Sequence, residues 1–299
     1  THSFGLLRMA LEIANTRRGI HMLYRFGITQ ALEHVILDGR NVELCRKILS
    51  QLNLCINDFP QKLVSGVVSS ANSLLVESAL LSLKQNLSSL PPPSQVHDES
   101  GRKTVTWFAT FFVNALEKMG KEKQTYFAVL ATKFCSLGYT KYLVNAGITK
   151  LGDNLLGFPN LLEHLLLDAS GFKFLSESGW LENHIRHQLV ETKTRAYMDN
   201  VQNLPSSHLR RWLRSALSDR GSRVEQAFSG EFQTLTVELS LENVFYCLGC
   251  TQNGLEWIVD HQILEMLVER IEDDDEPFVN RKASLWYLAL FASGSEGSG

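Results

Sequence analysis

The sequence contains little proline and cysteine and no long apolar run. Seven prolines and five cysteines are spread over 299 residues. No apolar stretch approaches the roughly 18 residues that a transmembrane helix needs. The odd number of scattered cysteines is unlike the dense, even set of a secreted disulfide scaffold. The sequence therefore predicts a protein with no membrane span and a cytoplasmic, reducing location.

The charge is nearly balanced. Lysine and arginine number 29 and the acidic residues 32, for a net charge of −3, which argues against a general nucleic-acid binder. With 44% apolar and 20% charged residues, the chain falls in the ordinary globular range. It starts without a signal peptide and stops directly after an apolar helical pattern. We therefore expect it to be a piece of a longer polypeptide.

Helical periodicity dominates the chain, whereas strand patterns are almost absent. No two alternating apolar runs are joined by Asn-Gly or Asp-Gly, the dipeptides typical of a β-hairpin. Apolar residues recur every three or four positions, as on one face of an amphipathic helix. We therefore expect an all-α fold. Helices are predicted over residues 45–56, 62–90, 107–119, 122–136, 154–167, 181–203, 206–218, 234–250, 255–271 and 278–292.

A short unit built around two glycines recurs along the chain. An apolar residue follows the first glycine directly, and another comes four positions after it. The second glycine comes eight positions after the first and is itself followed by an apolar residue. The complete copies are Gly19, Ile20, Leu23, Gly27, Ile28 and Gly171, Phe172, Leu175, Gly179, Trp180, and the degenerate copies are Tyr139, Leu143, Gly147, Ile148 and Gly254, Ile258, Gln262, Ile263.

The spacing of these copies predicts a helical repeat. The intervals between their first residues are close to three, one and two times a period of about 40 residues, the length of an armadillo or HEAT unit. The second glycine would close a short helix in the left-handed conformation, before a longer helix begins. We expect an armadillo/HEAT-like solenoid, in which stacked units share a continuous core. The alternative is that such turns recur by chance in an α-protein.

Two polar segments interrupt the helices and suggest a division of the chain. A polyproline turn at residues 91–93 runs into a polar loop, which is more typical of a stiff stop after a helix than of a ligand for a proline-reading module. The predicted parts are armadillo/HEAT-like repeats at 1–90, a Pro-rich polar loop at 91–103, central helical repeats at 104–204, a basic linker helix and loop at 205–233, and a truncated C-terminal repeat at 234–299.

The basic linker is the candidate partner-binding site. Residues 208–223 contain five arginines and a single acidic residue, Asp219. An acidic run, 272–276, follows about 50 residues later. Guanidinium groups present a planar fork of donors that suits carboxylate and phosphate. We expect Arg210, Arg211 and Arg214 to contact an acidic partner segment, and the alternative is a solvated linker.

Sequence patterns of catalysis and metal binding are incomplete. The chain has no phosphate loop, no Gly-x-Gly-x-x-Gly, no His-Glu-x-x-His and no Gly-x-Ser-x-Gly. Cys247 and Cys250 lack a second ligand pair and are better explained as core residues. His184, His187 and Glu191 share a helix face but have no further ligands. Asn86-Leu-Ser matches a glycosylation acceptor within an amphipathic helix. We predict a non-enzymatic protein with no cofactor and no metal.

From about residue 124 onward, the order of motifs resembles the Rictor (pianissimo) family, the repeat scaffold of TOR complex 2. The similarity begins at Gln124-Thr-Tyr126-Phe127 and continues with Leu151-Gly152-Asp153 before a leucine-rich helix. The turn from Gly171 to Trp180 looks like the family's turn and aromatic residue. Lys282-Ala283-Ser-Leu285-Trp286 is similar to its Lys-Ala-x-Leu-Trp helix. We expect both Trp180 and Trp286 to be core residues.

The resemblance implies a non-catalytic scaffold. Rictor-like proteins hold a TOR kinase with the other TOR complex 2 subunits, so TOR kinase and those subunits are the implied partners. The first hundred residues resemble armadillo repeats generally. Ser3-Phe-Gly-Leu, with Thr16, Gly19 and Gly27, also looks like the broad-minded family of ciliary proteins. The alternative is therefore a segment of such a ciliary protein, whose catalytic-like or GTPase-activating-like domain lies outside this chain.

Overall fold

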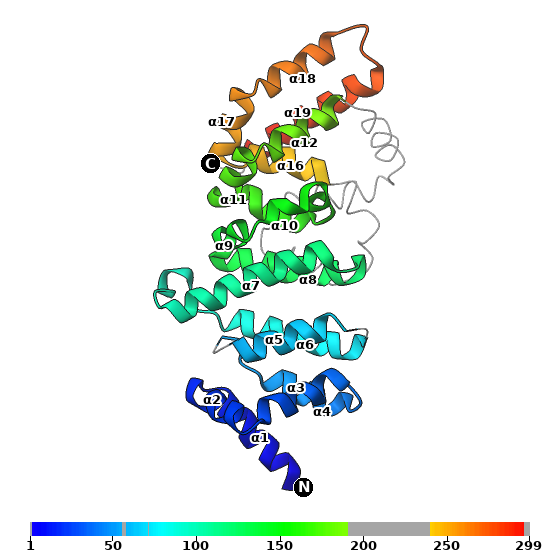
Figure 1. The fold of residues 1–299 in the computed structure, drawn as a ribbon. Coiled ribbons are helices and arrows are strands. Elements are labelled where there is room, and N and C mark those ends of the chain that lie inside the picture. Colours follow the sequence, from blue (N-terminus) through cyan, green and yellow to red (C-terminus); the bar gives the residue numbers. More distant parts are fainter. Residues whose placement is uncertain (1, 56–57, 71, 191–239, 296–299) are drawn as a thin grey trace. The chain divides into compact units, whose positions relative to one another are not determined.

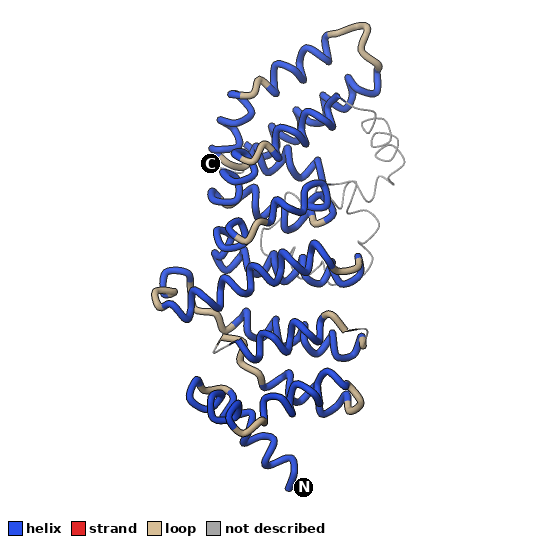
Figure 2. The backbone as a smooth tube through the Cα atoms, viewed as in Figure 1, coloured by secondary structure: helices blue, strands red, loops and turns tan. Residues whose placement is uncertain are grey.

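The described part of the chain is helical throughout. The structure, a computed structural model, describes residues 2–55, 58–70, 72–190 and 240–295, and these ranges contain helices and loops but no strand (Figure 2). The all-α prediction is therefore confirmed for these residues. The chain divides into two compact units, residues 1–148 and 149–299.

The first unit is made of helical hairpins (Figure 1). Within it, α3 packs on α5 and α4 on α6, while α5 with α6 and α7 with α8 form neighbouring pairs. Each helix therefore buries its apolar face against at least one other. The helices are α1 (His2–Ala14), α2 (Arg17–Arg25), α3 (Ile28–Asp38), α4 (Val42–Gln51), α5 (Asp58–Val68), α6 (Ser73–Ser88), α7 (Glu99–Lys118), α8 (Lys121–Phe134) and α9 (Thr140–Asn145).

Helix ends in this unit follow local capping chemistry. The helix predicted over 62–90 is in fact two helices, because Asn72 caps α6: its side chain accepts a hydrogen bond from the backbone N–H of Leu75. Asp98 caps α7 in the same way through Gly101. The Pro-rich loop therefore ends at Asp98 rather than Lys103, and residues 99–103 form the first turns of α7.

The Pro-rich loop is held against the rest of the unit. The hydroxyl of Tyr139, a fully buried residue, donates a hydrogen bond to the carbonyl of Pro91. A Cβ added to Gly138 would come within 3.1 Å of the Pro93 ring, so loop and turn are in close contact. Beneath them, Phe108, Phe112 and Phe134 form an aromatic cluster whose ring centroids lie 5.7–6.4 Å apart.

Side chains from three helices, and one from the residue after α1, hold the loop between α4 and α5. Asn86 on α6 accepts from Leu54 N (2.8 Å) and donates to the carbonyls of Leu52 (3.2 Å) and Ser82 (2.8 Å). Three more side chains bind backbone groups of this loop or of the end of α4. Asn15, the residue after α1, binds Gln51 and Asn53, Gln61 of α5 binds Leu54, and Thr104 of α7 binds Cys55. The buried backbone of the loop is thereby hydrogen-bonded, as burial requires.

We expect Asn86→Ala to lower the free energy of unfolding by about 2 kcal/mol, because it leaves buried donor and acceptor groups of the loop unpaired. Urea denaturation followed by circular dichroism measures the loss. The matched control is Gln85→Ala, one position away on an exposed part of α6. A change of less than about 0.5 kcal/mol for Asn86→Ala would show that the loop does not depend on this amide.

The second unit is also built from packed helices (Figure 1). In it, α16 packs on α10 and α19, α19 also packs on α18, and α11 contacts α17. The helix predicted over 255–271 is two helices, because Gln262 adopts a left-handed conformation with φ of 53°. The elements are the 3₁₀ segment Ile148–Gly157, α10 (Pro159–Leu167), α11 (Ala169–Glu177), α12 (Trp180–Val190), α16 (Ser240–Gly249), α17 (Gln252–Asp260), α18 (Ile263–Glu272) and α19 (Phe278–Ser295).

Candidate interaction surfaces

The recurring glycine unit has a defined local geometry at its start. Its first glycine lies three residues after a capping side chain: Thr16 Oγ1 accepts from Gly19 N, Asp168 Oδ1 from Gly171 N and Thr251 Oγ1 from Gly254 N, at 3.0–3.1 Å. A Cβ at these glycines would meet the carbonyl oxygen six residues earlier, that of Ile13, Leu165 or Leu248, at 2.0–2.3 Å. A side chain is therefore excluded at all three positions.

The end of the unit behaves as the sequence predicts. Gly27, Gly147 and Gly179 have φ values of 70°, 89° and 70°, and Gln262 takes the equivalent left-handed conformation in the degenerate copy. A second helix starts directly after Gly27, Gly179 and Gln262. The cap and close approach at the first glycine were not anticipated. The Thr or Asp three residues before it was the available sequence signal.

The two tryptophans expected in the core, Trp180 and Trp286, differ in burial. Trp180 is 6% exposed, stacks on His184 with ring centroids 4.0 Å apart, and donates from Nε1 to the Gly152 carbonyl at 3.1 Å. Trp286 is only partly buried, so its assignment to the core is wrong. Its neighbour Tyr287 fills the core position and stacks on Phe245 at 4.5 Å.

A groove runs along α5 and α7 in the first unit. Its chemistry is mixed, with cations, anions, hydroxyls and the indole of Trp107, which stacks on Phe111 at 5.0 Å. Lys103 and Glu99 pair at 2.7 Å on its rim, and this contact lowers the pKa of the Glu99 carboxyl. The lining residues are Asp58, Gln61, Lys62 and Ser65 of α5 and Glu99, Arg102, Lys103, Thr106, Trp107 and Thr110 of α7.

The groove lacks the arrangement of a site with an activated serine or cysteine nucleophile. Ser65 Oγ donates to the Gln61 carbonyl at 2.9 Å, and the groove residues include no histidine or cysteine that could activate a hydroxyl. Two helix stripes bearing both charge signs suit an extended polypeptide better than a small apolar ligand. The groove is therefore a candidate surface for a peptide.

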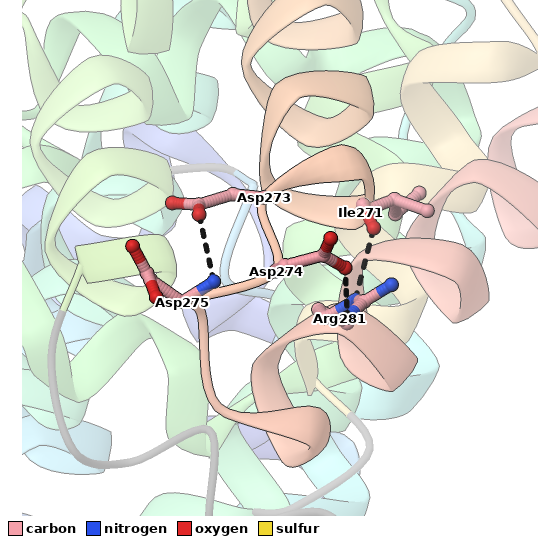
Figure 3. Close-up of polar contacts among 5 residues, drawn as sticks. All are labelled: Ile271, Asp273, Asp274, Asp275 and Arg281. Carbon is pink, nitrogen blue, oxygen red and sulfur yellow. Dashed lines mark hydrogen bonds and ion pairs between the residues drawn. The ribbon is translucent and has the colours of Figure 1, made fainter.

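The acidic run begins at Glu272, the last residue of α18, continues in the loop to α19, and is partly neutralised there (Figure 3). Arg281 donates from Nε to the Ile271 carbonyl at 2.9 Å and from Nη1 to Asp274 at 3.3 Å. Arg270 pairs with Glu276 at 3.3 Å, and Asp273 accepts from the backbone N–H of Asp275. Arg281 thereby caps the C-terminal end of α18 and orders the loop.

Other predicted positions have separate outcomes. Arg210, Arg211, Arg214 and Glu191 lie outside the described residues, and so does the side chain of His187. His184 stacks on Trp180, and its Nδ1 lies 3.0 Å from that residue's carbonyl. Within the described ranges, no group of three or more potential ligands is arranged to hold a metal ion.

The cysteines of the described ranges differ in burial. Cys247 is buried and Cys250 is partly exposed, so the core interpretation fits the first better than the second. Burial raises the pKa of the Cys45 and Cys55 thiols. A raised pKa leaves little thiolate near neutral pH, so these two thiols are poor nucleophiles.

Asn86 of the Asn-Leu-Ser sequence is buried, and its amide nitrogen donates two hydrogen bonds. This burial and these hydrogen bonds indicate a structural role for Asn86. Separately, none of the helices that the structure describes has both the length and the hydropathy required to cross a bilayer.

Comparison with models of known protein families and with curated protein sequences gave no match. The surfaces described above therefore have to be interpreted from their own chemistry.

Proposed function

We propose that this chain is a non-catalytic scaffold built as an armadillo/HEAT-like solenoid, and that it assembles protein partners. The observation that carries the proposal is the recurring unit of cap, closely packed glycine and left-handed turn at residues 16–27, 168–179 and 251–262. One local geometry repeated in both compact units is what an array of duplicated helical repeats would produce.

The particular scaffold that we propose is a divergent Rictor-like subunit acting in the cytoplasm. Support comes from the order of sequence motifs after residue 124, including the turn from Gly171 to Trp180. Under this proposal, the partners are TOR kinase and other TOR complex 2 subunits. The α5–α7 groove is the described surface on which we place a peptide segment of a partner, because it offers charges of both signs beside an indole.

Affinity purification of the full polypeptide from its own cells, followed by mass spectrometry, tests the partner assignment. We expect TOR kinase to be recovered in proportion to the tagged protein. Recovery of ciliary proteins without TOR kinase would support the broad-minded alternative, and recovery of neither would contradict both assignments.

A charge reversal in the groove, Lys62→Glu with Arg102→Glu, should reduce recovery of the groove's partner about tenfold, because acidic side chains of the bound segment would then meet carboxylates in place of these two cations. The matched control reverses Lys118 and Lys141, which are exposed residues of the same unit. Equal recovery with the groove variant and the control would mean that partners bind elsewhere.

A further inference from the structure

Helix α2 carries a positively charged outer face. The segment from Ile13 to Leu32 contains three arginines and one histidine and no acidic residue. Arg18, His21 and Arg25 are spaced by three and four positions, so they share one stripe of the helix. All three side chains are exposed. The outer surface of α2 therefore presents a row of two arginines and one histidine to solvent.

Large apolar side chains flank this row. Met22 and Phe26 lie on one side of it and Tyr24 on the other, by the 100° step of the helix. These three side chains are 52%, 71% and 66% exposed, respectively. Exposed aromatic residues grouped with arginine are the composition of protein-binding surfaces rather than of ordinary solvated ones. We call the surface formed by these six residues the α2 face.

The opposite side of α2 is already used by the fold. Ile20 and Leu23 are buried in a cluster with Ala14, against which Ile28 and Phe59 pack. A helix that binds a membrane surface immerses its apolar stripe in the lipid. That stripe is buried here, and cations occupy the centre of the exposed face. The arrangement favours an acidic polypeptide over a lipid surface.

The cations of the α2 face are not neutralised by their neighbours. Among the residues that the structure describes, neither Arg18 nor Arg25 takes part in an ion pair. On the adjoining helices, Glu12 of α1 pairs with Arg8 at 3.0 Å, and Asp38 at the end of α3 pairs with Arg40 at 3.1 Å. The guanidinium groups of Arg18 and Arg25 thus keep their donors available for carboxylates from outside.

We infer that the α2 face binds an acidic peptide segment that carries at least one aromatic or aliphatic side chain. Carboxylates of the segment pair with Arg18 and Arg25, while its apolar side chain packs on Met22 and Phe26. A single exposed ion pair contributes little, so both arginines and the apolar contact have to act together. The inference deepens the proposed scaffold function, on which it rests, by giving the chemical class of one partner.

The test uses the whole 299-residue chain and a fluorescein-labelled synthetic peptide of glutamates with one leucine and one phenylalanine, read by fluorescence anisotropy. We expect binding that weakens steeply as salt rises through about 0.15 M. Arg18→Glu with Arg25→Glu should weaken binding by at least about tenfold. The control, Lys118→Glu with Lys141→Glu, makes the same change of net charge on other exposed helix positions and should alter the affinity by less than about twofold.

Two further variants separate charge, packing and folding. Arg18→Gln with Arg25→Gln removes the two cations without adding carboxylates. This variant replaces the Arg18→Glu with Arg25→Glu variant if the latter loses its helical circular dichroism signal. Phe26→Ala should weaken binding about threefold to tenfold, because 71% of this side chain is available to a ligand. Full affinity in the glutamine variant, or equal binding of a glutamine-substituted peptide, would overturn the inference.

A membrane ligand is a separate outcome of the same test. If the chain sediments with vesicles of phosphatidylserine and phosphatidylcholine but does not bind the acidic peptide, the inference is wrong. Failure of peptide binding together with recovery of TOR kinase from cells would remove this inference and leave the proposed scaffold function intact. If the peptide binds but TOR kinase is not recovered from cells, this inference stands and the Rictor-like assignment is contradicted.

Discussion

Trp180→Ala is expected to lower the free energy of unfolding by about 4 kcal/mol. The indole of Trp180 is 6% exposed, and its removal leaves a cavity beside His184 and an unpaired carbonyl at Gly152. The cost therefore combines lost burial of an aromatic side chain with a lost hydrogen bond. Urea denaturation followed by the helical circular dichroism signal gives the value.

Two substitutions make this result specific. Trp180→Phe keeps an aromatic ring but removes the N–H donor to Gly152, and should cost about 1–2 kcal/mol. Trp286→Ala should also cost only about 1–2 kcal/mol, because part of that side chain is already in water in the folded protein. Equal losses at Trp180 and Trp286 would contradict the difference in burial between them.

Gly171→Ala is expected to cost about 3 kcal/mol, the upper end of the range for overpacking. The added Cβ would lie 2.3 Å from the carbonyl oxygen of Leu165 and 2.9 Å from its carbonyl carbon and Cα. These are backbone atoms of α10, so no side-chain rotation relieves the clash. The helix pair α10–α11 would have to separate, which the midpoint of thermal unfolding should report.

The chain contains matched controls for this glycine. Gly157→Ala places a Cβ in open space, and should change stability by less than about 0.5 kcal/mol. Gly179→Ala meets no backbone atom within 4 Å but has φ of 70°, so it should cost about 1 kcal/mol for the left-handed conformation alone. If Gly171→Ala were as mild as Gly157→Ala, the close approach of α10 and α11 would be wrong.

Local chemistry made much of this protein predictable. The three-and-four spacing of apolar residues indicated helices, and the described residues are helical. The second glycine of each unit indicated a left-handed turn, and Gly27, Gly147 and Gly179 adopt it. These features depend on residues close together in the chain. The breaks inside 62–90 and 255–271 were also local, but an Asn cap and a left-handed Gln262 are weaker signals than glycine.

Contacts between distant residues were decided only by the tertiary structure. Trp180 and Trp286 each lie on an apolar helical stripe in the sequence, and only packing shows that the first is buried while the second, on the same helix as the buried Tyr287, is partly exposed. Asn86 reads as part of a glycosylation sequence, yet it hydrogen-bonds a loop more than 30 residues away. Likewise, the outward position of Arg18 and Arg25 depends on which side of α2 the core covers. The sequence by itself determined where helices form, because capping and periodicity act within a few residues; which faces they bury was decided by the tertiary structure, because that depends on partners brought together by folding.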